Sequence, residues 1–325
     1  DSDLQTKDLY LNSRGDYRWQ RTEIGARGNF AQESIFTSEI LDTGINDLGG
    51  PGVIQPIETD TGELTLLDEH RNRFVVNPYA NFTLSPRSSI GIDATYLGVA
   101  YSGPQFLGRS DISQKALNTS VTRTIDTRTS ASARIFVSDF HAKINDNDTH
   151  TVGVEGSIAR KLSSIWSFTL ATGLERSAFN FVDPSGPPVE NAAANFTLDL
   201  GFIKHTELTD LSFDLRRSAD PSAAGFLTER NELQVLYKRA ITQRLTASFA
   251  VRAFQTRSLD HSEHVSERNF ARGALEIDWA FTPTWSFNVG YNTVSQTFLG
   301  ERRQNGHANL LSFGVVYRGL ARGPQ

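Results

Sequence analysis

Hydrophobic and polar residues alternate along most of this chain with a period of two. In the stretch WSFNVGYN, residues 285–292, aromatic or aliphatic residues take every second position and polar or small residues take the positions between. The alternation recurs in about 15 segments, many of them roughly 12–18 residues long, and no helical stripe extends beyond a couple of turns. The pattern therefore predicts an all-β chain.

The predicted connections alternate between tight turns and longer polar loops. Tight turns are predicted at 21–22, 86–88, 127–129, 162–164, 242–244 and 282–284. Longer loops are predicted at 41–70, 103–111, 144–149, 182–190, 218–225, 259–265 and 301–306. Strands of soluble sheets have a mode of about 5–6 residues, whereas long strands with alternating short and long connections are typical of outer-membrane barrels. The sequence thus predicts one domain over residues 1–325, a transmembrane antiparallel up-and-down β-barrel of about 16 strands (roughly 14–18), with short periplasmic turns and longer extracellular loops.

The two faces of these strands differ in chemistry. The polar phase predicts a pore lining of Arg14, Asp16, Arg18, Arg27, Asp93, Arg134, Glu155, Glu175, Asp199, Asp214, Arg216, Glu232, Lys238, Arg252, Arg268, Arg272, Glu276 and Asp278. The apolar phase predicts a lipid-facing aromatic girdle beside the tight turns, made of Trp19, Trp166, Phe168, Trp279, Phe281, Trp285, Phe287 and Tyr317. Each strand alone fits a soluble sheet equally well. Strand length, turn alternation, strand count and the girdle together favour the outer membrane.

The predicted lining mixes both signs of charge. Opposite charges on neighbouring strands can pair, so we expect a lining that holds the barrel shape by ion pairs; a polar ladder for a hydrated polymer is the alternative. The lining shows no ring of one sign, as an ion-selective pore requires, and no run of inward aromatic residues that could stack on sugars.

Composition excludes several other classes of protein. The chain has 325 residues, 38% of them hydrophobic, and no continuous apolar stretch of the roughly 18–20 residues that a membrane-spanning helix needs. It has no cysteine, which excludes disulfides and thiolate chemistry, and its net charge of −5 with no basic block argues against nucleic acid as a partner. It begins at Asp1 without Met or a signal peptide, so we expect a processed or trimmed chain.

Signals of catalysis and of metal binding are weak. The histidines fall in or beside predicted connections, away from a Ser nucleophile with an orienting carboxylate, and HSEH at 261–264 lacks a second motif. The loop at 41–70 is acidic and contains the GGPG kink at 49–52, so it is the predicted candidate for a pore constriction and a weak candidate for divalent cations. We therefore expect no enzyme activity, no cofactor and no metal.

One hairpin sequence occurs twice in the chain, and two other stretches resemble a known family. ERNELQVLYKRAITQRLTASFAV (229–251) lines up with ERNFARGALEIDWAFTPTWSFNV (267–289) as a repeated hairpin. YRWQRTEIGARGNFAQESIFTSEILDTG (17–44) and RRSADPSAAGFLTERNELQVLYKRAITQRLTASFAV (216–251) resemble a family of outer-membrane β-barrel porins associated with exopolysaccharide production and export in Gram-negative bacteria. In such relatives further strands precede the equivalent of Leu9, which implies about 16 strands here or about 18 in the native protein.

The resemblance implies a passive conduit for export of a polysaccharide in the bacterial outer membrane. The implied partners are the lipid bilayer, lipopolysaccharide, periplasmic export or envelope proteins and the polysaccharide itself. Two alternatives stay open: a structural barrel that anchors a larger envelope assembly with a partner in its lumen, and a general diffusion porin.

Overall fold

The computed structural model describes residues 9–34, 70–102, 110–143, 146–181, 189–221, 227–259, 267–299 and 304–317. The strands are β1 (Leu9–Arg18), β2 (Thr22–Ser34), β3 (His70–Ser85), β4 (Ser88–Ser102), β5 (Ile112–Thr124), β6 (Thr129–Ala142), β7 (Asn147–Lys161), β8 (Trp166–Phe181), β9 (Val189–His205), β10 (Thr209–Pro221), β11 (Leu227–Thr242), β12 (Leu245–Ser258), β13 (Glu267–Trp279), β14 (Trp285–Leu299) and β15 (Gln304–Tyr317). No helix within these ranges has the length and apolar character needed to cross a bilayer. The predicted all-β, up-and-down fold is confirmed.

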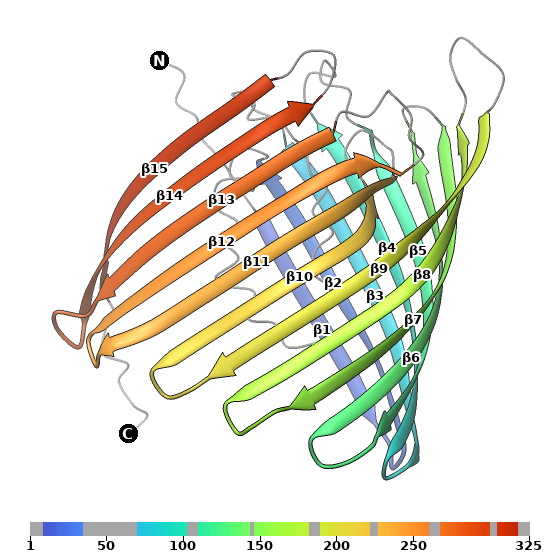
Figure 1. Ribbon diagram of the computed structural model, residues 1–325, viewed down its shortest axis with the longest axis horizontal. Helices are drawn as coiled ribbons and strands as arrows, with labels where there is room; N and C mark the ends of the chain where they lie inside the picture. The colour runs from blue at the N-terminus through green and yellow to red at the C-terminus, as the bar shows by residue number, and fades with distance from the viewer. Residues whose placement is uncertain are drawn as a thin grey trace.

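The fifteen strands form one antiparallel sheet in the order of the sequence. The sheet curls into an open barrel, so that β1 to β3 are seen behind β10 to β12 (Figure 1). β1 and β15 are its two edges, and no ladder joins them in the described part of the chain. Because consecutive strands are antiparallel, β1 and β15 run in the same direction. An antiparallel ladder between these two edges is therefore ruled out by the strand number alone.

The strands are 10 to 17 residues long and extend further than the sequence predicts at the end of the long connections. Residues 147–149 belong to β7 and residues 218–221 to β10, although both segments were predicted as loops. These strand ends contain residues that are common in loops, such as Asn, Asp, Ser and Pro. An alternation of apolar and polar positions is therefore hard to recognise in them. The predicted loop at 41–70 lies outside the described residues except for its last residue, His70.

Five of the short turns are closed by the same side-chain contact. In each, an oxygen of the first residue accepts a hydrogen bond from the backbone N–H three residues later. The pairs are Asp126 with Thr129 (2.8 Å), Ser163 with Trp166 (3.2 Å), Thr206 with Thr209 (2.9 Å), Thr242 with Leu245 (3.0 Å) and Thr282 with Trp285 (3.0 Å). Asp, Ser and Thr favour such turns for this reason. The turn at 206–208 was not predicted, although TELT repeats the pattern of TQRL and TPTW.

The turn between β5 and β6 leads to a prediction about pH. The backbone N–H of Arg128 donates to Asp126 at 2.7 Å and is the largest cause of a lowered pKa of Asp126; desolvation opposes it, and Thr129 contributes less. Because the folded pKa lies below the unfolded one, this carboxylate stabilises the fold above the unfolded pKa. That stabilisation is lost as the pH falls through the lowered folded value.

We therefore expect Asp126→Ala to reduce the free energy of unfolding at about pH 6 and to have a smaller effect at about pH 3, below the unfolded pKa of 3.8. Urea unfolding in lipid vesicles, followed by tryptophan fluorescence, measures both values. Asp126→Asn is the control, because it keeps an acceptor oxygen without a titrating group. An equal effect of Asp126→Ala at both pH values would contradict the prediction.

Candidate functional site

The residues predicted to line a pore all lie on one face of the sheet, which we term the inner face. Side chains alternate between the faces of a strand, and paired residues share a face. Arg134 is opposite Glu155, and Asp199 is opposite Arg216. Followed from strand to strand, the register brings together Arg14, Asp16, Arg18, Arg27, Asp93, Arg134, Glu155, Glu175, Asp199, Asp214, Arg216, Glu232, Lys238, Arg252, Arg268, Arg272, Glu276 and Asp278. That they line a lumen remains a prediction.

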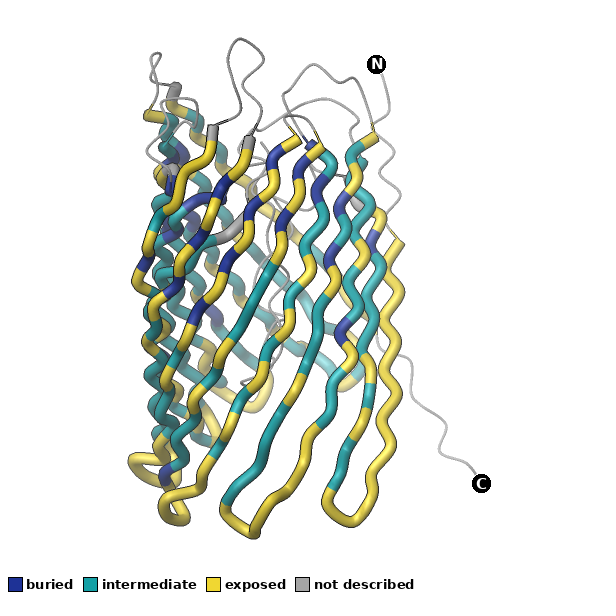
Figure 2. The backbone as a smooth tube through the Cα atoms, turned by 90° about the vertical axis from the view of Figure 1, so that its right-hand side faces the viewer, coloured by how far each residue is buried: buried dark blue, intermediate teal, exposed yellow. Residues whose placement is uncertain are grey.

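Burial also alternates along the strands. Buried and exposed residues follow one another, and the buried ones gather toward the long connections (Figure 2). Several buried residues are polar, including Asn195 and Glu175 of the inner face. The inner face is thus the enclosed side of the curled sheet.

Side chains of the inner face bind one another across the strands. The Arg134 guanidinium lies 2.8 Å from the Glu155 carboxylate, which is the kind of pairing that the sequence predicts. The Asn195 amide donates to Glu175 at 2.9 Å. Contacts of this kind fix the side chains in place and leave a polar wall.

Four arginines and three phenylalanines gather on the inner face of β11 to β14. This arginine–phenylalanine cluster consists of Arg230, Arg252, Arg268, Arg272, Glu232, Phe254, Phe270 and Phe298. Three successive cross-strand rows hold it: Arg230, Thr256, Arg268 and Phe298; then Glu232, Phe254, Phe270 and Gln296; then Gln234, Arg252 and Arg272. All three rows lie in the parts of these strands that are nearer the long connections.

The phenylalanine rings support the guanidinium groups. The rings of Phe254 and Phe270 stack with centroids 4.6 Å apart and planes 15° apart. Cζ of Arg230 lies 4.0 Å from the Phe254 centroid, and Cζ of Arg268 lies 5.1 Å from that of Phe270. Arg252 lies farther away, 5.8 Å from the Phe254 centroid. The electron-rich ring faces attract these cations.

Oxygen atoms hold the other edges of the guanidinium groups. The two carboxylate oxygens of Glu232 lie 2.9 Å from Nε of Arg230 and 2.5 Å from Nε of Arg252. Arg268 donates to the amide oxygen of Gln296 at 2.8 Å. Arg272 likewise donates to the amide oxygen of Asn292 at 3.0 Å. One carboxylate therefore bridges two arginines, while amide oxygens orient the other two.

The cluster is buried and its surroundings are positive. Arg230 is 4% exposed and Phe254 7%. In the described residues, the inner face of β10 to β14 carries five arginines against two carboxylates over these rows: Arg216, Arg230, Arg252, Arg268 and Arg272 against Asp214 and Glu232. Toward the short turns the balance reverses, with Lys238 against Asp210, Glu276 and Asp278. From β10 to β14, the inner face is thus positive toward the long connections and negative toward the short turns.

The prediction that no aromatic side chains run along this face is wrong. Phe254, Phe270 and Phe298 share the inner face with the arginines. Arg230 was also missing from the predicted lining. A signal for the cluster does exist, because RAF (252–254) and RNFAR (268–272) place Arg and Phe at alternate positions of one face.

A hydrophobic cluster occupies another part of the inner face, which the sequence analysis did not predict. Its members include Leu97, Val99, Ile112, Phe140 and Phe179, all near the ends of their strands at the long connections. The inner face is therefore apolar in this region. Alternation alone did not reveal it, because apolar residues here occupy both phases of the strands.

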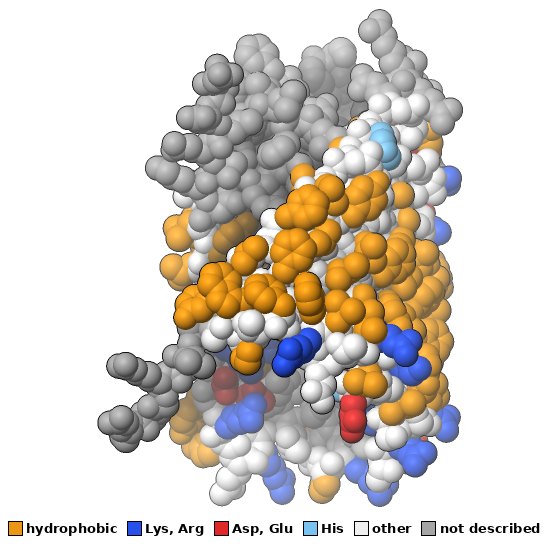
Figure 3. Space-filling view, turned by 90° about the vertical axis from the view of Figure 1, so that its left-hand side faces the viewer, with side chains coloured by type: hydrophobic (Ala, Val, Ile, Leu, Met, Phe, Trp, Pro, Cys, Tyr) orange, Lys and Arg blue, Asp and Glu red, His pale blue; other side chains and the backbone are white. Residues whose placement is uncertain are grey.

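The opposite, outer face carries exposed hydrophobic side chains. Ile135, Val154, Leu174 and Phe196 form one row across β6 to β9, and Leu174 is 64% exposed. On another side of the molecule, hydrophobic side chains form a broad band with charged side chains gathered below it (Figure 3). An apolar band on the outer face together with a polar inner face is the pattern expected of a membrane barrel.

The predicted girdle residues lie at or beside the short-turn ends of their strands. These are Trp19, Trp166, Phe168, Trp279, Phe281, Trp285, Phe287 and Tyr317. The ring centroids of Trp285 and Tyr317 lie 4.8 Å apart, and those of Phe168 and Phe202 lie 4.9 Å apart. Phe202 was not included in the predicted girdle. Contact of these rings with lipid remains a prediction.

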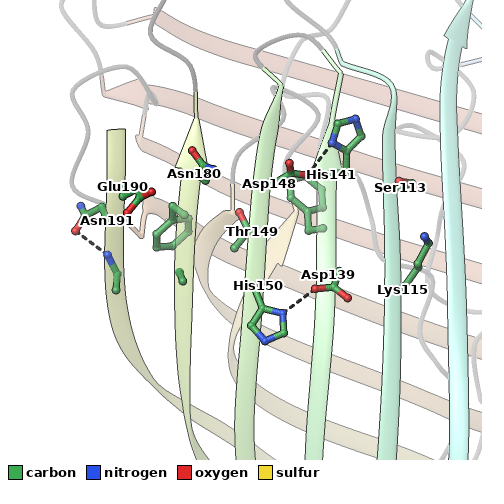
Figure 4. A pocket seen from close by; sticks show the side chains of 14 residues that line it. Ser113, Lys115, Asp139, His141, Asp148, Thr149, His150, Asn180, Glu190 and Asn191 are labelled. Carbon is green, nitrogen blue, oxygen red and sulfur yellow. Dashed lines mark hydrogen bonds and ion pairs between the residues drawn. The ribbon is translucent and has the colours of Figure 1, made fainter. Parts of the chain in front are cut away.

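An open hollow of about 980 Å³ lies at the long-connection end of β5 to β9. Two histidine–carboxylate pairs line it: Nδ1 of His150 lies 2.7 Å from Asp139, and Nδ1 of His141 lies 2.9 Å from Asp148 (Figure 4). In the described ranges no three His, Cys, Asp or Glu residues are grouped to hold a metal ion. The HSEH segment lies outside those ranges.

Comparison of the fold identifies the class of barrel. The chain superimposes on a mutant of the ferric enterobactin receptor PfeA from Pseudomonas aeruginosa in complex with enterobactin with a TM-score of 0.50 and 10% identity, over 99% of this chain and 59% of that one. The siderophore receptor PiuA from Acinetobacter baumannii gives 0.50 and 11%, over 97% and 62%. The FrpB iron transporter from Neisseria meningitidis gives 0.53 and 10%, over 91% and 54%. The fold is therefore that of an outer-membrane β-barrel.

The chain spans less than two thirds of the length of each of these proteins. No protein-family model matches the sequence, and no curated protein matches it significantly. The three structures are named as receptors or a transporter. The predicted location in the bacterial outer membrane agrees with this fold. At these identities the likeness concerns the fold alone.

Proposed function

We propose that this chain is an outer-membrane channel that carries a hydrophilic polymer, a polysaccharide, through a polar lumen. The observation that supports this most directly is the division of one curled sheet into two faces. The outer face exposes Ile135, Val154 and Leu174, whereas the inner face at the same strands carries Arg134 and Glu155. Lipid outside and water inside satisfy both faces at once.

The inner wall suits a hydrated polymer better than a small ion of one sign. Arg134 is paired with Glu155, and Asn195 is bonded to Glu175, so much of the wall presents neutral pairs and amides. Such a wall exchanges hydrogen bonds with sugar hydroxyls without holding them tightly. The resemblance to porins of exopolysaccharide export supports the same cargo and implies periplasmic partners.

The second candidate is a receptor that takes up a small anionic ligand. The arginine–phenylalanine cluster favours it, because the cluster concentrates positive charge at one place on the wall. The fold shared with PfeA, whose structure contains enterobactin, is in keeping with a ligand-binding barrel. The two candidates differ in whether neutral solutes pass through.

Planar-bilayer recording of the purified full chain tests the channel. We expect stepwise conductance that falls when neutral dextran enters the lumen, because the polymer displaces conducting electrolyte. The matched measurement uses a variant lacking residues 41–69, with Leu9–Ser34 and the strands from β3 onward unchanged. Absence of conductance in both folded proteins would overturn the proposal.

A further inference from the structure

We propose that the outer face of β5 to β9 binds a molecule of lipopolysaccharide, with acyl chains, phosphate and sugars following one another along the strands. The inference concerns the outside of the barrel, so it does not depend on what passes through the lumen. Two hollows adjoin on this face. The polar hollow is the one of about 980 Å³ at the long-connection end, and the apolar hollow, of about 570 Å³, lies next to it toward the short turns on β6 to β9.

The apolar hollow belongs to the lipid-facing band of the outer face. Ile135, Val154, Leu174 and Phe196, the row across β6 to β9, line it. A hollow in such a surface surrounds an acyl chain on several sides. Dispersion contacts grow with the number of neighbouring atoms, so a chain held there is bound more firmly than one that lies against a flat wall.

Arg176 lies at the border between the two hollows. It lines the apolar hollow and is the first charged residue beyond Leu174 on the outer face of β8. Its side chain is exposed, and its cross-strand neighbours are Val152 and Ala194. Among the residues that the structure describes, the Arg176 side chain has no ion pair or hydrogen bond. Its guanidinium is therefore available to a lipid phosphate, which arginine binds through paired hydrogen bonds.

The polar hollow presents hydrogen-bonding groups of several kinds. Nδ1 of His150 lies 2.7 Å from Asp139, and Nδ1 of His141 lies 2.9 Å from Asp148 (Figure 4). Both carboxylates are thus bonded to an imidazole, and Asn180 adds an amide opposite Asp148. Carboxylates, imidazoles and amides exchange hydrogen bonds with hydroxyl groups. A lining of this kind suits sugars better than acyl chains.

Short side chains open the polar hollow, and a second cation flanks it. Ala178 and Ala192 face each other across β8 and β9 in its wall. Lys115 and Glu190 lie at opposite sides of it (Figure 4). Lys115 is exposed, and its side chain has no ion pair or hydrogen bond in the described part of the chain, because its cross-strand neighbour Asp139 is bonded to a histidine. We therefore expect phosphate on the side of Lys115 and sugars toward Glu190.

The order of these features favours lipopolysaccharide over a phospholipid. Both lipids have acyl chains and phosphate, which would occupy the apolar hollow and reach Arg176. Lipopolysaccharide also has a chain of linked sugars, and the polar hollow is at the upper end of the range of about 300–1,000 Å³ that is usual for small-molecule sites. The long connections are the predicted extracellular end of the barrel, which is the side on which Gram-negative outer membranes carry lipopolysaccharide.

Native mass spectrometry of the full chain in detergent micelles tests this inference. The probes are purified lipopolysaccharide with a complete core and phosphatidylglycerol. We expect lipopolysaccharide to bind about tenfold or more tightly than phosphatidylglycerol, because only the former fills both hollows. Lys115→Gln combined with Arg176→Gln should weaken lipopolysaccharide binding by about tenfold or more, since two charge-assisted contacts with phosphate are lost.

Arg123→Gln combined with Arg160→Gln is the matched control. Both arginines are exposed on the outer face, at the short-turn ends of β5 and β7, so this variant removes the same charge at the opposite end of the strands. Its effect on lipopolysaccharide binding should be negligible. Arg176→Lys should weaken binding less than Arg176→Gln, since the charge stays without the planar fork. Heat-modifiable electrophoretic migration verifies that each variant is folded.

Ala178→Phe tests the place of the sugars. Ala178 lies between His150 and Ala192 in the wall of the polar hollow, so a phenyl ring there fills space that the sugars need. We expect binding of lipopolysaccharide with a complete core to weaken by about tenfold, as for the loss of one or two hydrogen bonds. Binding of lipid A, which has no core sugars, should stay unchanged.

Three results would overturn the inference. The wild type binds phosphatidylglycerol as tightly as lipopolysaccharide; the Lys115 and Arg176 double Gln variant binds lipopolysaccharide as the wild type does; or Ala178→Phe leaves binding of the complete core unchanged. Conductance is measured on the same preparations and should be equal in all variants. Failure of the lipid site and failure of the channel are therefore separate outcomes.

Discussion

Leu174→Arg is expected to lower the free energy of unfolding in a lipid bilayer by about 2–4 kcal/mol, the largest effect that we expect on the outer face. Leu174 lies near the middle of β8 and is 64% exposed, between Val154 and Phe196 in a row of apolar residues. A guanidinium there must either leave water or bend back toward an interface, and both cost free energy. Urea unfolding in vesicles of defined lipids measures the change.

Thr197→Arg is the matched control. Thr197 is adjacent to Phe196 on β9 but belongs to the inner face. It is opposite Gly173 of β8, which in turn is opposite Glu155 of β7. Arginine at this site has polar neighbours on the inner face, so we expect a change of less than about 1 kcal/mol. If both substitutions had the same effect, the assignment of the outer face to lipid would fail.

Glu232→Gln is expected to destabilise the barrel by about 3 kcal/mol, because it removes the carboxylate that bridges the buried Arg230 and the half-buried Arg252. Arg230 and Arg252 would then repel each other across the Phe254 ring. The same unfolding titration in vesicles measures the loss, and the slope against urea shows whether the transition stays cooperative.

Two comparisons separate the ion pair from a general effect of the substitution. Glu23→Gln removes one of the two carboxylate partners of Arg18, an exposed pair at 3.3 Å, and should cost no more than about 1 kcal/mol. Combining Glu232→Gln with Arg252→Gln should cost less than the sum of the two single changes, because one of the two repelling cations is gone. Additive effects would mean that Glu232 and Arg252 do not stabilise each other.

Local patterns in the sequence were enough to predict the strands and most of the turns. A period of two, strand length and polar breaks depend on near neighbours in the chain, so Trp285 to Tyr291 could be assigned to a strand without any partner. The turn at 206–208 shows that even a local signal can be overlooked. Thr206 closes that turn as Thr242 and Thr282 close theirs.

The arginine–phenylalanine cluster could not be predicted in the same way, because it exists only through the register between strands. Phe254 in its own strand is one aromatic residue in a polar phase. It becomes part of a site only when β11 places Arg230 over its ring and β13 places Phe270 against it. The hydrophobic cluster around Phe140 was hidden for a different reason, because apolar residues there occupy both phases of the strands. Register depends on pairing between strands, and a single sequence does not display it.

The repeated hairpin sets a length scale on the inner wall. Arg230 and Arg268 occupy the same position in the two ERN copies, and the register places Thr256 between them. Neighbouring strands are about 4.8 Å apart, so the two repeats are offset by two strand widths, about 9.6 Å. Backbone hydrogen bonds determine this interval independently of side-chain packing. Duplication of one more hairpin would therefore add a further arginine at the same interval, and the wall could lengthen its row of cations in fixed steps without any change to the existing strands.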